Sequence, residues 1–190
     1  MIDKFDMGNG QTLKIFQDMS SFDPRDDDNL SEMYCFHNNY SLGDNHHING
    51  DNYGSFDEMV RDNTTKSDII LNLYLYDHGG ITISHTPFGC RFDSGQVGFA
   101  VVPIKTIIHN YGDNSPESRE KALACMIAEI ETYDMFLTGS VYGFTITEEE
   151  TCNLGHTHET EIDSCWGFFG YDHEASGLFD HAGYKTKETA

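Results

Sequence analysis

The 190-residue sequence is poor in basic residues: it has 11 Lys and Arg against 32 Asp and Glu, a formal net charge of −21. Because every contact to a phosphate group needs a cation, this charge disfavours direct binding to nucleic acid or to an anionic membrane. It favours attraction to basic surfaces and multivalent cations. Two interpretations stay open. The acidity only keeps the protein soluble, or the negative surface occupies a nucleic-acid channel in place of DNA.

Long apolar runs and export signals are also missing. No stretch approaches the roughly 20 apolar residues that span a bilayer, and the N-terminal MIDKFDMGNG has no features of a signal peptide. The five cysteines are irregularly spaced and include no CxxC pair, which is typical of free thiols in a reducing compartment. We therefore expect a cytoplasmic protein without membrane contacts. The sequence leaves its oligomeric state open.

Several signatures of catalysis and recognition are absent from the sequence. The segment GQVG at 95–98 lacks the Lys and Ser or Thr of a phosphate-binding loop, and neither GxSxG nor HExxH occurs. Basic patches with interleaved aromatic residues, the usual mark of nucleic-acid recognition, are missing as well. The sequence therefore leaves open whether the protein is an enzyme, and it points to no cofactor.

The length and the pattern of apolar residues predict a single α+β domain over residues 1–170 and a flexible C-terminal tail over 171–190. Residues that favour β-structure predict a mostly antiparallel sheet. Its strands are expected at 11–17, at 69–84 as a hairpin, at 96–102, at 141–146 and at 162–170. The stretch TEEETCNLGHTHETE, at 147–161, is expected to be a polar connection between two strands.

One long helix, at about 115–138, is predicted from an apolar stripe at helical spacing. Ser115 is a natural N-cap and Pro116 a natural first residue for it. One or two short helices complete the prediction. The first begins after Ser55, which opens a capping-box pattern, and the second follows Pro103.

A polar group interrupts the predicted hairpin and precedes the next strand. Asp77 and His78 lie at the hairpin turn, and Asp93, Ser94 and Gln96 lie just before 97–102. If both segments reach the same end of the sheet, a base, an acid and an amide donor converge there, as in an acid/base or binding site. The alternative is turn chemistry, in which the Asp side chains form Asx turns and Gln96 pairs with backbone amides.

A further unusual segment, DSCWGFFG at 163–170, carries Trp166, which we include among the candidate binding residues. A nucleophilic Cys165 would need a nearby base and an electropositive setting. The acidic chain disfavours a thiolate, so packing is the expected role of this cysteine.

The histidines suggest a metal site only weakly. His78 and His85 lie near two aspartates, and His156 and His158 share one face if their segment is a strand. No ligand spacing of a known zinc motif occurs. We therefore expect no metal, with these four histidines as the weaker candidates for its ligands.

Four blocks of the sequence resemble an uncharacterised family of small proteins carried by bacteriophages, plasmids and other mobile elements. The blocks are MYCFHNNYSLGD, LYLYDHGGITISHTPFGCRFDSGQVGFAVV, ETYDMFLTGSVYGF and DSCWGFFG. The family patterns are MYCWHRRYNLGD, LYLYDHSGITxSTxPFSCPWDSGQVGxIYV, ETYDxYLTGxVYGF and DSCWGFYG. The blocks occur in the same order and cover about a third of the chain.

This sequence departs from the family pattern at several positions. Gly79 replaces Ser, Arg91 and Phe92 replace Pro and Trp, and His85 replaces a smaller polar residue. The HTH segment is not part of the pattern, which weakens the metal role of its two histidines. The family has no established activity, so no catalytic role is carried over. The resemblance implies an accessory protein of a mobile element that works inside a bacterial cell.

Three functional hypotheses follow. The first is an accessory protein that binds and modulates a host system, a defence antagonist for example, by presenting an acidic, nucleic-acid-mimicking surface to a host protein with a basic surface. The second is a small hydrolytic or metal-dependent enzyme with a pocket at Asp77, His78, Asp93 and Gln96. The third is a minor structural protein of a virion.

Overall fold

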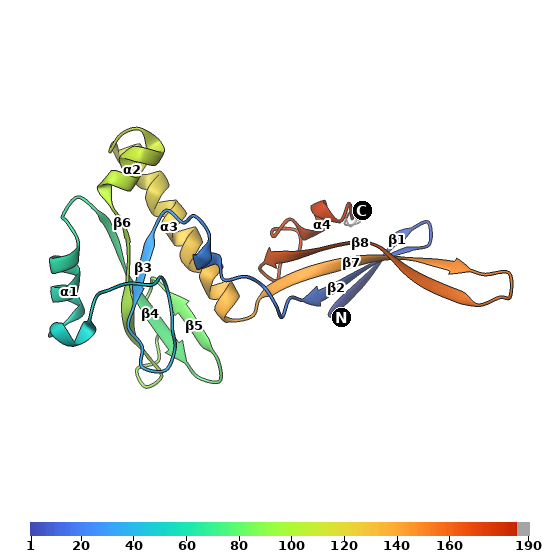
Figure 1. The fold of residues 1–190 in the computed structure, drawn as a ribbon, viewed down its shortest axis with the longest axis horizontal. Coiled ribbons are helices and arrows are strands. Elements are labelled where there is room, and N and C mark those ends of the chain that lie inside the picture. The colour runs from blue at the N-terminus through green and yellow to red at the C-terminus, as the bar shows by residue number, and fades with distance from the viewer. Residues whose placement is uncertain (186–190) are drawn as a thin grey trace. The chain divides into compact units, whose positions relative to one another are not determined.

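The computed structural model describes residues 1–185 and confirms the α+β class. Within that range, eight strands form two four-stranded antiparallel sheets, and four α-helices accompany them (Figure 1). Where one domain was expected, the chain divides into two compact units. We call residues 23–138 the central unit, and residues 1–22 with the chain from 139 onward the terminal unit. The division arises because each unit encloses its own hydrophobic core.

The central unit contains the predicted hairpin and third strand. Strands β4 (Ile69–Asp77) and β5 (Ile81–Ser84) form the hairpin, and β6 (Ser94–Val102) pairs with β4. The short strand β3 (Glu32–Cys35), which was not predicted, completes the order β3-β6-β4-β5. Because β6 lies between β3 and β4, the segments after β3, at the end of β4 and at the start of β6 lie next to one another.

Helix α3 (Pro116–Leu137) agrees with the predicted long helix and covers one face of this sheet. The Ser115 hydroxyl accepts a hydrogen bond from the Ser118 N–H, as expected of an N-cap. The buried side of the helix consists of Ala122, Met126, Ile130 and Tyr133, which join Leu73, Ala100 and Val102 in one core. The short helices α1 (Phe56–Asn63) and α2 (Ile104–Tyr111) also form where they were predicted.

The terminal unit is a meander in which β1 (Asp3–Gly8), β2 (Gln11–Gln17), β7 (Val141–Thr151) and β8 (Thr157–Phe169) follow one another. A flexible tail was predicted from residue 171, and residues 171–185 of it are described. This segment forms α4 (Leu178–His181), and Leu178 is fully buried against the core of the sheet. It packs there because its apolar residues cover the apolar face of the sheet. Residues 186–190 lie outside the described range.

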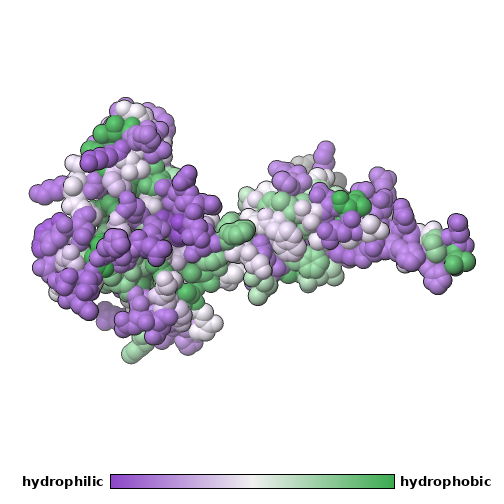
Figure 2. Space-filling model, viewed as in Figure 1, coloured by the Kyte–Doolittle hydropathy of each residue, from purple (hydrophilic) through white to green (hydrophobic). Residues whose placement is uncertain are grey.

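The polar connection predicted at 147–161 is mostly strand. Strand β7 runs on to Thr151 and β8 starts at Thr157, and the two pair along this whole length. The hairpin was missed because its outer residues are exposed on both faces, so no apolar alternation marks the strands. Figure 2 shows a hydrophilic surface along the free end of this hairpin, with a small hydrophobic patch at its tip. We call residues 147–163 the acidic ribbon.

Two buried acids in the central unit predict a loss of stability in alkali. Burial raises the pKa of Cys35 from 9.0 to about 12 and that of Tyr133 from 10.0 to about 12. Both groups hold their protons more tightly in the folded protein, so unfolding releases protons between pH 9 and 12. The free energy of unfolding should therefore fall as the pH rises through this window.

Chemical denaturation at pH 8, 9, 10 and 11 measures this slope. The variant Cys35→Ala should show a shallower fall than the wild type, whereas Cys152→Ala, at a half-buried thiol in the β7–β8 turn, should keep the wild-type slope. Equal slopes in all three proteins would contradict the assignment to Cys35.

Candidate functional site

Asp77 and Asp93 lie at the same end of the central sheet, which the sequence had left as one of two interpretations. The Asp77 N–H donates a hydrogen bond to the Asp93 carbonyl oxygen at 2.8 Å. His78, in the hairpin turn, places its Nδ1 atom 3.4 Å from Asp93 Oδ2 and exposes 71% of its side chain. The three residues come together because β4 ends beside the start of β6.

The contacts of this group do not match a nucleophile activated by a base. The Cys90 thiol lies 3.6 Å from Asp93 Oδ2, so Asp93 stands between the thiol and His78. In a nucleophilic site of this type, the histidine would lie between the thiol that it deprotonates and the carboxylate that orients it. Ser94 donates its hydroxyl hydrogen to the Cys90 carbonyl oxygen, and the Gln96 amide donates to the Gly98 carbonyl oxygen at 3.3 Å. Both contacts run from a side chain to a backbone carbonyl oxygen, whereas the turn-chemistry alternative had the Asp side chains in Asx turns and Gln96 paired with backbone amides.

A cavity of about 370 Å³ lies against these residues. Two of the side chains that line it were not predicted from the sequence. Asp77, Asp93 and Gln96 line it together with Phe36 and His37, which follow β3. The Phe36 N–H donates to the Val97 carbonyl oxygen at 2.8 Å, which extends the pairing of β3 with β6. One signal was available: both segments belong to the blocks that resemble the mobile-element family.

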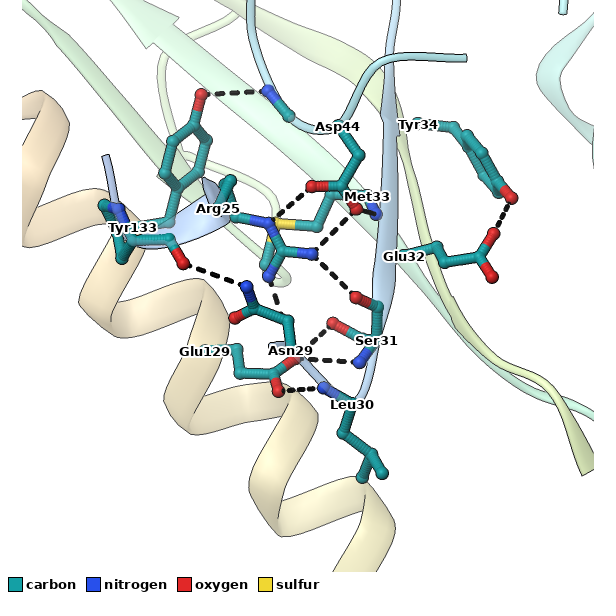
Figure 3. Close-up of polar contacts among 12 residues, drawn as sticks. Arg25, Asn29, Leu30, Ser31, Glu32, Met33, Tyr34, Asp44, Glu129 and Tyr133 are labelled. Atoms are coloured by element: carbon teal, nitrogen blue, oxygen red, sulfur yellow. Dashed lines mark hydrogen bonds and ion pairs between the residues drawn. The ribbon is translucent and has the colours of Figure 1, made fainter. Parts of the chain in front are cut away.

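A buried arginine holds the segment around β3 in place (Figure 3). Only 3% of the Arg25 side chain is exposed, and its Nε and Nη2 atoms each donate to the Asp44 carboxylate at 2.8 Å. The same carboxylate accepts the Met33 N–H at 2.8 Å. Arg25 Nη2 also donates to the Ser31 carbonyl oxygen at 2.6 Å. Such two-pronged pairing fixes both position and orientation.

Helix α3 anchors the same segment at two further points (Figure 3). Glu129 accepts the N–H groups of Leu30 and Ser31 at 2.6 and 3.0 Å, and the Tyr133 hydroxyl accepts the Gly43 N–H at 2.8 Å. The backbone before and after β3 is therefore tied to a rigid helix. This is what positions Phe36 and His37 at the cavity.

Trp166 belongs to the terminal unit, where it lies over a glycine. A Cβ atom on Gly143 would come within 2.3 Å of Trp166 Cε3, and the indole lies 6.2 Å from the Phe16 ring. The exposed fraction of Trp166 is 48%. The neighbouring Cys165 packs against the core of this unit, which is the role expected of it. Trp166 therefore belongs to a different unit from Asp77, His78, Asp93 and Gln96.

Nothing in the described range supports a metal site. Among residues 1–185, no cluster of three or more His, Cys, Asp and Glu side chains is arranged to hold a metal ion. The candidates are divided between the units: His78 and His85 lie in the central unit, and His156 and His158 in the terminal unit.

Among residues 1–185, no helix has the length and hydropathy to cross a bilayer.

The acidic ribbon concentrates negative charge on an exposed two-stranded element. Its acidic residues are Glu148, Glu149, Glu150, Glu159, Glu161 and Asp163, and residues 141–170 contain no Lys or Arg. The ladder between β7 and β2 ends at Glu148, and the Glu149 N–H donates to the Gly10 carbonyl oxygen at 3.2 Å. Further out, the side chains of both strands are exposed. Alternate side chains point to opposite faces, which distributes the carboxylates around the ribbon.

Lys14 of β2 compensates one of these charges. It forms an ion pair with Glu159, which also accepts the Thr147 hydroxyl at 2.7 Å, and the hydrogen bond from Lys14 lowers the pKa of Glu159. Glu159 stands directly opposite Glu149 in the ladder. The remaining acidic side chains of the ribbon have no ion-pair partner among the described residues.

No family model, curated protein or solved structure matches this chain.

Proposed function

We propose that the protein is an accessory binding protein of a bacteriophage or other mobile element, and that its acidic ribbon binds a basic, nucleic-acid-binding surface of a host protein. The observation that carries the proposal is the charge per unit length of the ribbon. Glu148, Glu149 and Glu150 are consecutive strand residues, so the strand carries one charge about every 3.4 Å, on alternate faces, and charges on the same face lie about 6.8 Å apart. One strand of DNA carries one phosphate about every 3.4 Å along its axis.

The energetics of the ribbon favour the same interpretation. Like charges directly opposite in a ladder are destabilising, and an exposed two-stranded ribbon is only marginally stable. Glu149 stands opposite Glu159, whose charge Lys14 compensates, so the uncompensated charge lies on the other carboxylates of the outer ribbon, which has no hydrophobic face to offset their repulsion. A partner that supplies cations on both faces relieves this repulsion. Solubility alone needs net charge but no such concentration of it on one element.

The experiment compares two variants with the same change in net charge. Glu148→Gln/Glu149→Gln/Glu150→Gln neutralises three of the six carboxylates of the ribbon, and Asp26→Asn/Asp27→Asn/Asp28→Asn neutralises three exposed carboxylates of the central unit. Immobilised full-length protein is incubated with bacterial lysate at about 0.1 M salt and eluted at about 1 M salt, where exposed charges are screened. We expect the wild type to retain DNA-binding proteins that added duplex DNA displaces.

The ribbon variant should retain these proteins at least about tenfold less, because each lost carboxylate removes a close charge pair. The variant of the central unit should retain them like the wild type. An equal loss in both variants would show that net charge acts without a defined surface. Retention that duplex DNA does not displace would contradict mimicry of nucleic acid.

A further inference from the structure

We propose that the cavity of the central unit binds an organic cation, an ammonium or guanidinium group carried on an apolar stem. This inference concerns a different unit from the ribbon and does not depend on the proposed function. The cavity, of about 370 Å³, has the size of a small-ligand site and is built from segments that lie far apart in the sequence. Its polar and apolar walls each restrict what fits.

The polar wall offers acceptors that lack a matching donor. Within the described residues, the Asp77 carboxylate has no hydrogen-bond or ion-pair partner. Among residues 1–185, the polar contacts of the Asp93 carboxylate are with His78 and the Cys90 thiol, at 3.4 and 3.6 Å. Gln96 uses its amide N–H on the Gly98 carbonyl oxygen, which leaves its carbonyl oxygen as an acceptor. A ligand that pairs with this wall must supply several hydrogen-bond donors.

The charge of the wall decides between a neutral and a charged ligand. Two carboxylates lie at the cavity, and neither Lys nor Arg lines it. In a protein of net charge −21, such a site repels anions and attracts a cation to the Asp77 and Asp93 carboxylates. Ammonium and guanidinium groups combine this charge with several donors.

The apolar wall fits the stem and the face of such a cation. Phe36, Leu75 and Phe92 line the cavity together with the carboxylates. The Phe36 ring packs against His46, at a centroid distance of 4.7 Å, and against Phe56, at 6.1 Å. Phe92 is 98% exposed, so the fold does not use its ring for packing. A cation between carboxylates and aromatic faces gains from both.

Two sources carry this chemistry: a free amine, or an Arg or Lys side chain of a partner protein. The test titrates ¹⁵N-labelled full-length protein with agmatine, with a blocked tetrapeptide containing one arginine, and with pentylurea as a neutral analogue. We expect saturable shifts of the Phe36, Gly95 and Gln96 amides with agmatine or the peptide, and none with pentylurea. Tighter binding of the peptide identifies a protein side chain as the ligand, and tighter binding of agmatine identifies a free amine.

Matched variants make the test specific. Asp77→Asn and Asp93→Asn should each weaken binding at least about tenfold, and Phe92→Ala about twofold to fivefold. Asp27→Asn, which changes the charge equally at an exposed site outside the cavity, should leave affinity within about twofold. Neutralising Glu148, Glu149 and Glu150 should have no effect, so failure of the ribbon proposal leaves this one standing. Equal weakening by Asp27→Asn and Asp77→Asn, or the absence of saturable shifts, would overturn the inference.

Discussion

Replacing Arg25 with alanine should lower the free energy of unfolding of the central unit by about 3–5 kcal/mol, because it leaves buried charge without a partner. The side chains of Asp44 and Glu129 are only 23% and 13% exposed, and Arg25 Nη1 lies 3.8 Å from Glu129 Oε2. Without the guanidinium, both carboxylates stay partly desolvated next to each other. The loop before β3 also loses its hydrogen bond to the Ser31 carbonyl oxygen.

Urea denaturation followed by circular dichroism measures this loss. Arg61→Ala is the matched control, since Arg61 also pairs with two acidic residues but exposes 68% of its side chain. It should change stability by no more than about 1 kcal/mol. A loss below about 1 kcal/mol for Arg25→Ala would mean that the network in Figure 3 contributes little to holding the segment around β3.

Gly98→Ala should destabilise the central unit by about 3 kcal/mol or more, because its new methyl group collides with backbone. A Cβ atom at this position would lie 1.9 Å from the Tyr34 carbonyl oxygen and 3.0 Å from Cys35 Cα. Both atoms belong to β3, which pairs with β6 at this point. A strand backbone has no rotamer to change, so β3 must move away from β6.

This displacement should reach the cavity. The Phe36 N–H would lose its hydrogen bond to Val97, and hydrogen exchange at that amide should accelerate strongly in Gly98→Ala. Gly95→Ala, in the same strand, is the control, since a Cβ atom there meets nothing within 4 Å. Its stability and its Phe36 exchange should stay close to wild type. Similar behaviour of the two variants would show that β3 adapts to a side chain at position 98.

The elements that sequence patterns predicted well are those with a strong local signal. Helix α3 combines an N-cap at Ser115 with an apolar stripe, and its observed limits agree with those predicted. The β4–β5 hairpin and β6 are rich in residues that favour strands. In these segments the apolar residues recur at the period of the helix or strand that they form. Each element can therefore be predicted without knowledge of the elements that pack against it.

The elements that were missed lack such a signal. Strand β3 has only four residues, and β1 is mostly exposed with two aspartates among six residues. The outer ribbon has no buried face at all, and Leu178 of α4 gains its importance only from the sheet that it covers. Each of these elements is stabilised by partners distant in the sequence.

The sequence by itself determined the extreme negative charge and the α+β class, and it offered the approach of Asp77 to Asp93 as one of two interpretations. Only the tertiary structure decided that Phe36 and His37 complete the cavity, that Trp166 lies in the other unit, and that the carboxylates at 148–163 occupy a paired ribbon. The physical reason is that composition and the spacing of apolar residues predict individual helices and strands. The strand order β3-β6-β4-β5 and the extension of β7 and β8 depend instead on pairing with other segments, which no local pattern encodes.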